Sequence, residues 1–281
     1  MGFLSHNFDR LYNIKNWNIY RRATEIGNES FPKLKENNDT KNLLKHRKLN
    51  DILLGRIKGD FSTLDLRASN LIGANLTGHD LTNVLLNESD LRNIYYQFGI
   101  LSGSDLTNTI LANAYLKDAK LNDTKLTNAD LSNAILDETD LSNADLRNAT
   151  LINAQLTGAY LGPNLDRSDK TTNLNGANLN GAKLEGAYLI KVSFDSTNLK
   201  NTDLSNSIIC LPENYTSLIL NENTNFNNSI IDDSEFINYI DKFTRNVPQH
   251  ITNKKDLEDK LKTKLNDKLL NFILVSSKLP K

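Results

Sequence analysis

Leucine returns at every fifth position over a long part of this chain, and that spacing is the feature that most restricts the fold. The clearest run is Leu121, Leu126, Leu131, Leu136, Leu141, Leu146, Leu151 and Leu156. An α-helix cannot keep such a series on one side, because five residues advance the position around the axis by about 140°. An ordinary strand would alternate without a break, whereas here an inward pair such as Ala129 and Leu131 is followed by Ser132 and Asn133. The repeat therefore predicts a coil of short strands joined by corners.

Asparagine and glycine occupy the predicted corners. Asn tolerates a positive φ and hydrogen-bonds its own backbone, and Gly adopts a positive φ without steric cost. The corner residues are Asn83, Asn93, Asn108, Asn113, Asn128, Asn133, Asn143, Asn148 and Asn153, with Gly73, Gly78, Gly103 and Gly158. We expect these positions to turn the chain between one short strand and the next.

The repeat resembles the motif A(D/N)LXX of the pentapeptide-repeat family. The matching triplets are Ala-Asp-Leu at 129–131 and 144–146 and Ala-Asn-Leu at 74–76 and 177–179. The resemblance implies an all-β solenoid, a right-handed quadrilateral β-helix with four repeats to a coil. With four repeats to a coil, residues twenty apart should stack, which would place His79 in an inward column beside Gly99. We expect His79 to be a packed side chain.

The repeats divide the chain into four parts. Residues 59–209 form the pentapeptide-repeat β-helix, with a loop break at 162–173 where the five-residue register is lost. Residues 210–252 contain a loop, beginning near Pro212, and weak terminal repeats centred on Phe226, Ile231 and Phe236. Residues 1–58 and 253–281 flank these parts, and we expect both to be helical capping segments.

The N-terminal segment 1–58 is basic, with 12 Lys and Arg against 6 Asp and Glu. Its apolar residues recur at helical spacing, which favours a cap over the exposed end of the solenoid. The alternative is a surface for an acidic partner or nucleic acid, formed by Arg21, Arg22, Lys45, Arg47 and Lys48.

The C-terminal segment 253–281 carries leucines at i, i+4 spacing among many lysines. They are Leu257, Leu261, Leu265 and Leu269. This pattern predicts one amphipathic helix of about twenty residues, whose apolar stripe must be buried. The helix either caps the second end of the solenoid or forms a homodimer through those four leucines.

Catalysis and cofactor binding find no support in the sequence. The four histidines are scattered, and the single Cys210 has no second thiol with which to form a disulfide or a zinc site. No glycine-rich phosphate loop or metal-ligand cluster is present. We expect no enzyme activity, no cofactor, no metal and no small-molecule substrate. No apolar run reaches the length of a membrane span and no secretory signal is evident, so we expect a cytoplasmic protein.

A strip of exposed apolar residues is the first candidate for an interaction surface. If residues twenty apart stack, one side of the solenoid presents Asn75, Tyr95, Tyr115, Ile135 and Gln155, with Phe98 at a nearby corner. Aromatic and aliphatic side chains exposed together on a polar rod indicate a protein-binding surface. The alternative is that they lie beneath the N-terminal segment or a loop.

Acidic columns provide the second candidate. The outward positions carry Asp90, Asp105, Asp130, Asp140 and Asp145, and residues 59–209 contain 11 Lys and Arg against 18 Asp and Glu, a net charge of −7. Some pentapeptide-repeat proteins bind DNA gyrase or another type II topoisomerase as acidic mimics of DNA and dimerise through a C-terminal helix. That resemblance implies a topoisomerase partner, although Lys120 and Lys125 interrupt the acidic columns here. The hypothesis we favour is a scaffold that binds an unidentified protein through one side of the rod, and the DNA mimic is the alternative.

Overall fold

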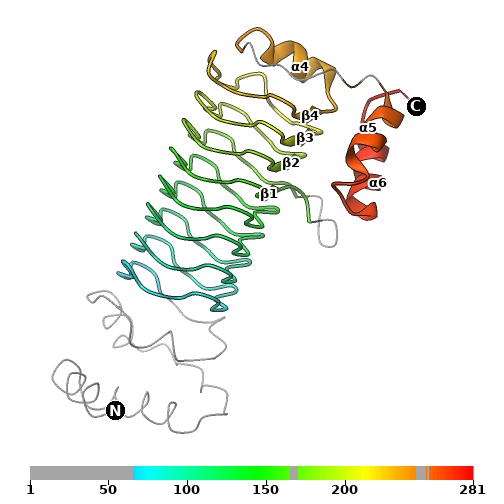
Figure 1. The fold of residues 1–281 in the computed structure, drawn as a ribbon. Coiled ribbons are helices and arrows are strands. Elements are labelled where there is room, and N and C mark those ends of the chain that lie inside the picture. The colour runs from blue at the N-terminus through cyan, green and yellow to red at the C-terminus, as the bar shows by residue number, and fades with distance from the viewer. Residues whose placement is uncertain (1–65, 165–169, 245–250, 252, 281) are drawn as a thin grey trace, which may run out of the picture.

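The chain forms a solenoid of stacked coils with a helical arm against one side (Figure 1). The structure is a computed structural model that describes residues 66–164, 170–244, 251 and 253–280. The expectations placed on residues 1–58 lie outside the described residues. Parallel backbone bridges join residues twenty positions apart along the solenoid, for example Asp90 with Ile110 and Ile110 with Asp130. Each of the regular coils up to Tyr160 therefore consists of four pentapeptides.

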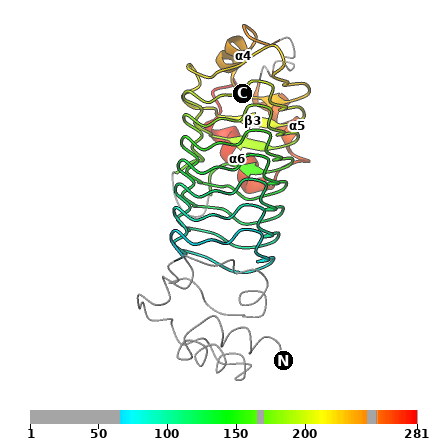
Figure 2. The same cartoon turned by 90° about the vertical axis from the view of Figure 1, so that its left-hand side faces the viewer.

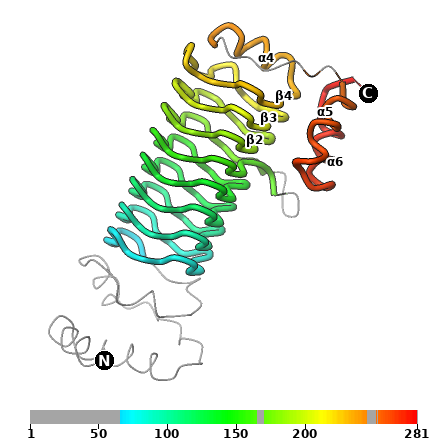
Figure 3. The backbone as a smooth tube through the Cα atoms, viewed as in Figure 1, coloured from blue at the N-terminus to red at the C-terminus, as the bar shows by residue number. Residues whose placement is uncertain are grey.

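Hydrogen bonds along the axis hold one coil to the next. The N–H of Leu121 donates to the carbonyl oxygen of Asp140 at 2.7 Å, and the N–H of Asp140 donates to that of Ala119 at 3.1 Å. The same pattern recurs through the rod, which Figure 3 shows as a regular stack of turns. Because these bonds run between coils, every interior coil stabilises its two neighbours.

The predicted corners are confirmed. Every asparagine and glycine predicted to form a corner has a positive φ, for example Asn113 at 60° and Gly103 at 70°. The residues that follow return to extended backbone, so the chain makes one short strand per pentapeptide. The corner chemistry therefore sets the five-residue period.

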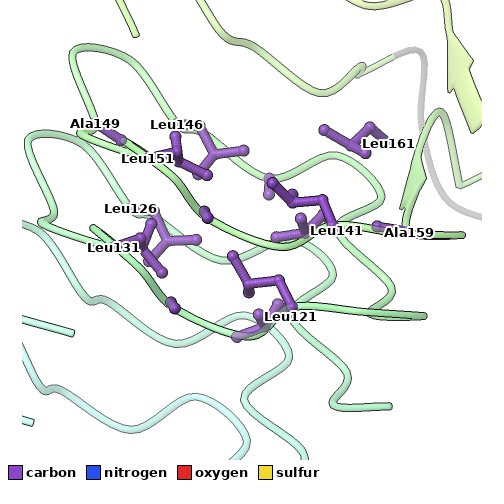
Figure 4. Close-up of a cluster of buried hydrophobic side chains, with 14 of the residues drawn as sticks. Leu121, Leu126, Leu131, Leu141, Leu146, Ala149, Leu151, Ala159 and Leu161 are labelled. Atoms are coloured by element: carbon purple, nitrogen blue, oxygen red, sulfur yellow. The ribbon is translucent and has the colours of Figure 1, made fainter. Parts of the chain in front are cut away.

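The interior is filled by ladders of leucine and small side chains. In Figure 4 the buried ladder includes Leu121, Leu141 and Leu161, which belong to successive coils. The slots between leucines hold Ala, or Ser and Thr whose hydroxyls donate to carbonyl oxygens, as Thr109 does to Leu86 at 3.0 Å. Burial of each leucine contributes about 1.5–3 kcal/mol.

Four short parallel strands form a sheet on one side of the solenoid, in the order β1-β2-β3-β4. They are β1 (Tyr160–Leu161), β2 (Tyr188–Ile190), β3 (Ile208–Cys210) and β4 (Ile230–Ile231). Tyr160 pairs with Tyr188, 28 positions later rather than twenty, so eight extra residues leave the rod within the predicted break at 162–173. The register of the coils survives this insertion.

The last coil ends in a helix that was not predicted. Helix α4 (Ser234–Ile240) begins at its N-cap Asp233 and packs Phe236 against Phe194 and Phe226 of the solenoid core. Phe226 and Ile231 are buried in the core as terminal repeats would be, whereas the third predicted repeat, centred on Phe236, is wrong because this residue is helical.

The C-terminal segment forms two helices rather than the single predicted one. They are α5 (Lys254–Leu261) and α6 (Asp267–Ser276), and α6 starts at its own N-cap, Asn266. We call residues 253–280 the C-terminal arm. Figures 1 and 2 show the arm on the side of the rod that carries β1–β4. Within the residues that the structure describes, no helix is long and apolar enough to cross a membrane.

Candidate protein-interaction surface

The predicted apolar strip lies in one column of the solenoid. Bridges join Asn75 to Tyr95, Tyr95 to Tyr115, Tyr115 to Ile135, and Ile135 to Gln155. The rings of Tyr95 and Tyr115 stack with centroids 4.8 Å apart and planes inclined by 2°. Tyr95 is 44% exposed, while Tyr115 and Ile135 are half-buried. We call Tyr95, Tyr115, Ile135 and the adjacent Phe98 the aromatic strip.

Phe98 occupies a strained position at the corner beside this column. Its φ is +59°, a region that is disfavoured for residues other than Gly, Asn and Asp, and its side chain is 64% exposed. The equivalent corner one coil earlier is Gly78, which has no such strain. An exposed phenyl group in a strained conformation does not stabilise the core, and this favours a binding role for Phe98.

The predicted acidic residues are spread over three columns. Asp90 and Asp130 flank Ile110, Asp105 and Asp145 flank Lys125, and Asp140 lies between Lys120 and Tyr160. The structure therefore brings together the two pairs but does not join all five carboxylates on one face.

Basic side chains also neutralise three of these carboxylates. Arg92 pairs with Asp90 and Arg147 with Asp145, each at 2.6 Å, and Lys125 lies 3.6 Å from Asp105. Partial burial would raise the pKa of Asp145, but hydrogen bonds and the positive charge from Arg147 outweigh it and hold the pKa below its usual range. A phosphate-like row of free negative charge does not form along any of these columns.

The residues with reactive side chains do not form a catalytic group. Within the described ranges, no cluster of three or more His, Cys, Asp or Glu residues could hold a metal ion. Cys210 is fully buried, and desolvation, followed by the nearby charge of Asp232, raises the pKa of its thiol. This thiol is therefore shielded and protonated rather than activated.

His79 is not the packed core residue that the sequence predicted. It is half-buried at the surface, with Nδ1 3.1 Å from the carbonyl oxygen of Thr77. The interior misfit is Tyr96, which is buried and whose hydroxyl lies 2.8 Å from the carbonyl oxygens of His79 and Ile100. A Cβ at Gly99 would lie 2.2 Å from Cε1 of Tyr96, so the glycine makes room for this ring.

The leucines of the C-terminal arm are buried within the chain. Leu257, Leu261 and Leu269 pack with Ile208 and other apolar residues of β2–β4, and Leu265 packs partly buried at the edge of this cluster. The expectation of a homodimer through these four leucines is therefore wrong for this structure, because their apolar stripe already has an intramolecular partner. The C-terminal arm covers the side of the solenoid, whereas α4 covers its end.

A buried carboxylate lies under the arm and was missed by sequence reasoning. Asp232 is 4% exposed, accepts a 2.8 Å hydrogen bond from the N–H of Leu211, and has no partner for Oδ2. Desolvation raises its pKa to about 6, with the neighbouring charge of Asp233 adding to the effect. Asp233 in turn lies 4.0 Å from Lys278 of the arm. No local signal marks Asp232, because the residues that cover it come from a distant part of the chain.

Comparison with known proteins agrees with the coil geometry. The family model described as pentapeptide repeats matches residues 64–94, 100–136, 124–162 and 172–209, in eight copies. No curated protein matches the chain.

Several solved structures are similar to the chain. The heterocyst differentiation regulator HetL of the cyanobacterium Nostoc is 27% identical over 56% of this chain and 82% of its own, with a TM-score of 0.25. QnrB1, a plasmid-mediated fluoroquinolone resistance protein, is 16% identical over 70% of this chain and 97% of its own, with a TM-score of 0.27. Rfr23 of the cyanobacterium Cyanothece is 22% identical over 58% and 90%, with a TM-score of 0.20. The repeat region of the chain, over the residues that this family model matches, therefore consists of pentapeptide repeats, and proteins of that family are right-handed β-helices.

Proposed function

We propose that this protein is a non-enzymatic scaffold that binds another protein through the side of the solenoid that carries the aromatic strip. The observation that carries the proposal is the stacked pair of the exposed Tyr95 and the half-buried Tyr115, which lies beside the strained and more exposed Phe98. Large aromatic side chains are the commonest energetic centres of protein interfaces. A rod whose coils are joined by backbone hydrogen bonds presents them at fixed spacing, which lowers the entropic cost of binding.

The alternative, an acidic mimic of DNA that binds a type II topoisomerase, has weaker support. The five carboxylates lie in three columns, and three of them have a basic partner within 4 Å. A mimic of duplex DNA needs a dense row of uncompensated negative charge. The arrangement of charge therefore favours a partner that recognises the strip.

Affinity capture from a lysate of the source organism tests the proposal. The wild-type chain is compared with Tyr95→Glu/Tyr115→Glu at the same salt concentration, and Leu85→Glu/Ile110→Glu serves as the control because it places the same charges on two other columns. We expect the first variant alone to lose its partner while both keep the circular-dichroism spectrum of the wild type. Equal capture by all three proteins would refute the proposal, and capture of a topoisomerase by all three would favour the DNA mimic.

A further inference from the structure

The C-terminal arm shows how this solenoid binds a helix. The outward column beneath the arm consists of Tyr160, Tyr188, Ile208 and Ile230, which pair in register on successive coils. All four belong to, or pack against, the apolar cluster that also contains Leu269 and Ile273 of α6. This column is therefore a surface that an amphipathic helix already covers.

Helix α6 runs along the axis of the rod. Leu269, in its first turn, lines a cleft with Tyr160 and with Leu265, which precedes the N-cap. Ser276, at the other end of α6, lines a cleft with Asp232, three coils further on. The length of α6, ten residues, corresponds to about 15 Å. Three steps between stacked strands of about 4.8 Å give about 14 Å, which agrees with this direction.

The match between helix and column follows from two similar spacings. Leu269 and Ile273 are four residues apart and lie on one side of α6, about one turn or 5.4 Å from each other. Coils repeat at about 4.8 Å, so two or three successive turns stay aligned with two or three successive coils. A helix can therefore place one apolar side chain on each coil.

The aromatic strip repeats the beginning of the covered column. Along the rod the covered column reads Tyr, Tyr, Ile, Ile, and the strip reads Tyr95, Tyr115, Ile135 in the same direction. Within the part of the chain that the structure describes, no helix packs on the strip, and Tyr95 and Phe98 keep about half of their surface exposed.

The charges on the two sides of the strip differ. The corner column on one side continues from Phe98 to Asp118 and Glu138, which follow it at twenty-residue spacing. The corner column on the other side consists of Asn93, Asn113 and Asn133, which are neutral. A helix lying on the strip would therefore gain from basic residues along one of its flanks only.

We infer that the aromatic strip is a docking site for an amphipathic α-helix of another protein, with an apolar residue on each of two or three successive turns and Lys or Arg on the flank that faces Asp118 and Glu138. The inference rests on the proposed scaffold function and specifies the class of partner. The segment that binds is short, because three coils span only about 10 Å between their first and last strands.

The probe for this site is a fluorescent synthetic peptide of about five helical turns, rich in Ala, with Leu at i, i+4 and i+8 and Lys along one flank. A second peptide has the same composition but with the Leu residues distributed around the helix. Binding to the full-length protein is followed by fluorescence anisotropy. We expect the first peptide to bind and the second to bind at least about tenfold more weakly.

Three double variants locate the binding. Tyr95→Ser/Tyr115→Ser should weaken binding of the first peptide at least about tenfold, whereas Leu85→Ser/Ile110→Ser, on other columns, should change it less than about twofold. Asp118→Asn/Glu138→Asn should weaken it about threefold at low salt and not at about 1 M salt. Asn suits both positions, because their φ values are 58° and 59°.

Absence of binding, equal binding of the two peptides, or an unchanged affinity of Tyr95→Ser/Tyr115→Ser would overturn the inference. The lysate capture separates this failure from failure of the scaffold function. If a partner is still lost with Tyr95→Glu/Tyr115→Glu while the peptide does not bind, the function stands and the helical partner does not. If capture does not depend on the strip, the function itself fails.

Discussion

The charge on Asp232 should weaken the attachment of the C-terminal arm at neutral pH. Its carboxyl is buried beneath the arm, with Oδ2 unpartnered, and its pKa is raised to about 6 from 3.8. The groups around it are the thiol of Cys210, Asp233 and Ser277, and Lys191, Glu213 and Lys278 line the same cleft. Desolvation is the main cause of the raised pKa, and the arm supplies part of that desolvation.

The sign and size of the effect follow from linkage. The native carboxyl keeps its proton to a higher pH than the unfolded one, so its contribution to the free energy of unfolding is complete below about pH 4 and is lost as the pH rises through about 6. A difference of about two pH units corresponds to about 3 kcal/mol at neutral pH. The side chain of Asp232→Asn cannot ionise, so the free energy of unfolding of this variant should not fall in this way as the pH rises.

The test compares the stability of the wild type and Asp232→Asn at pH 4 and pH 7. Urea unfolding is followed by circular dichroism, and hydrogen exchange reports on the amides of α6. The stability of the variant relative to the wild type should rise by about 2 kcal/mol between the two pH values, because part of the loss has already occurred at pH 4. Any constant cost of the new amide group cancels in this difference. The exposed Asp241→Asn is the control, and an equal difference at both pH values for Asp232→Asn would refute the reasoning.

Three further predictions concern single positions. Gly99→Ala should destabilise the protein by about 1–3 kcal/mol, because the new Cβ would lie 2.2 Å from Tyr96. Thermal unfolding of the double variant Gly99→Ala/Tyr96→Leu should show that the smaller Leu side chain relieves most of this loss. Additive effects of the two substitutions would contradict the steric explanation. Phe98→Asn should raise the free energy of unfolding by about 1 kcal/mol because Asn tolerates the φ of +59°, and a lower urea midpoint would contradict this. Cys210 should remain unlabelled by a water-soluble maleimide in the native protein and react once urea unfolds it, so rapid native labelling would count against its burial.

The coil could be predicted from the sequence because the same five-residue pattern occurs many times along the chain. Each pentapeptide supplies an inward Leu, an inward small residue and a corner that accepts a positive φ. An irregular repeat can therefore still be assigned correctly from the repeats on either side of it. The stacking of Tyr95 on Tyr115 followed directly from the period. Its use as a binding surface stays a prediction.

The C-terminal part could be predicted less well because its pattern leaves the partner undefined. The leucine spacing from Leu257 onward indicates that one stripe is buried, but it does not distinguish the end of the rod, a second copy and the side of the sheet. Asn266 as an N-cap, which separates α5 from α6, was the local signal that the prediction passed over. Asp232 carried no signal, because its burial depends on Ser277 and other residues far along the chain.

The eight-residue insertion after β1 shows that the columns of this solenoid keep their register when the chain between two coils becomes longer. The insertion is not a multiple of five, and yet Tyr160 still pairs with Tyr188 on the next coil. Removal of twenty residues from within the rod would shorten it by one coil and leave every column intact. Removal of five residues between Tyr95 and Tyr115 would instead shift all later residues by one side of the coil, so that Tyr115 would no longer stack on Tyr95 and the row would be lost. A change in length is therefore neutral when it adds or removes a whole coil, tolerated when the columns keep their register as they do after β1, and destructive when it shifts the columns.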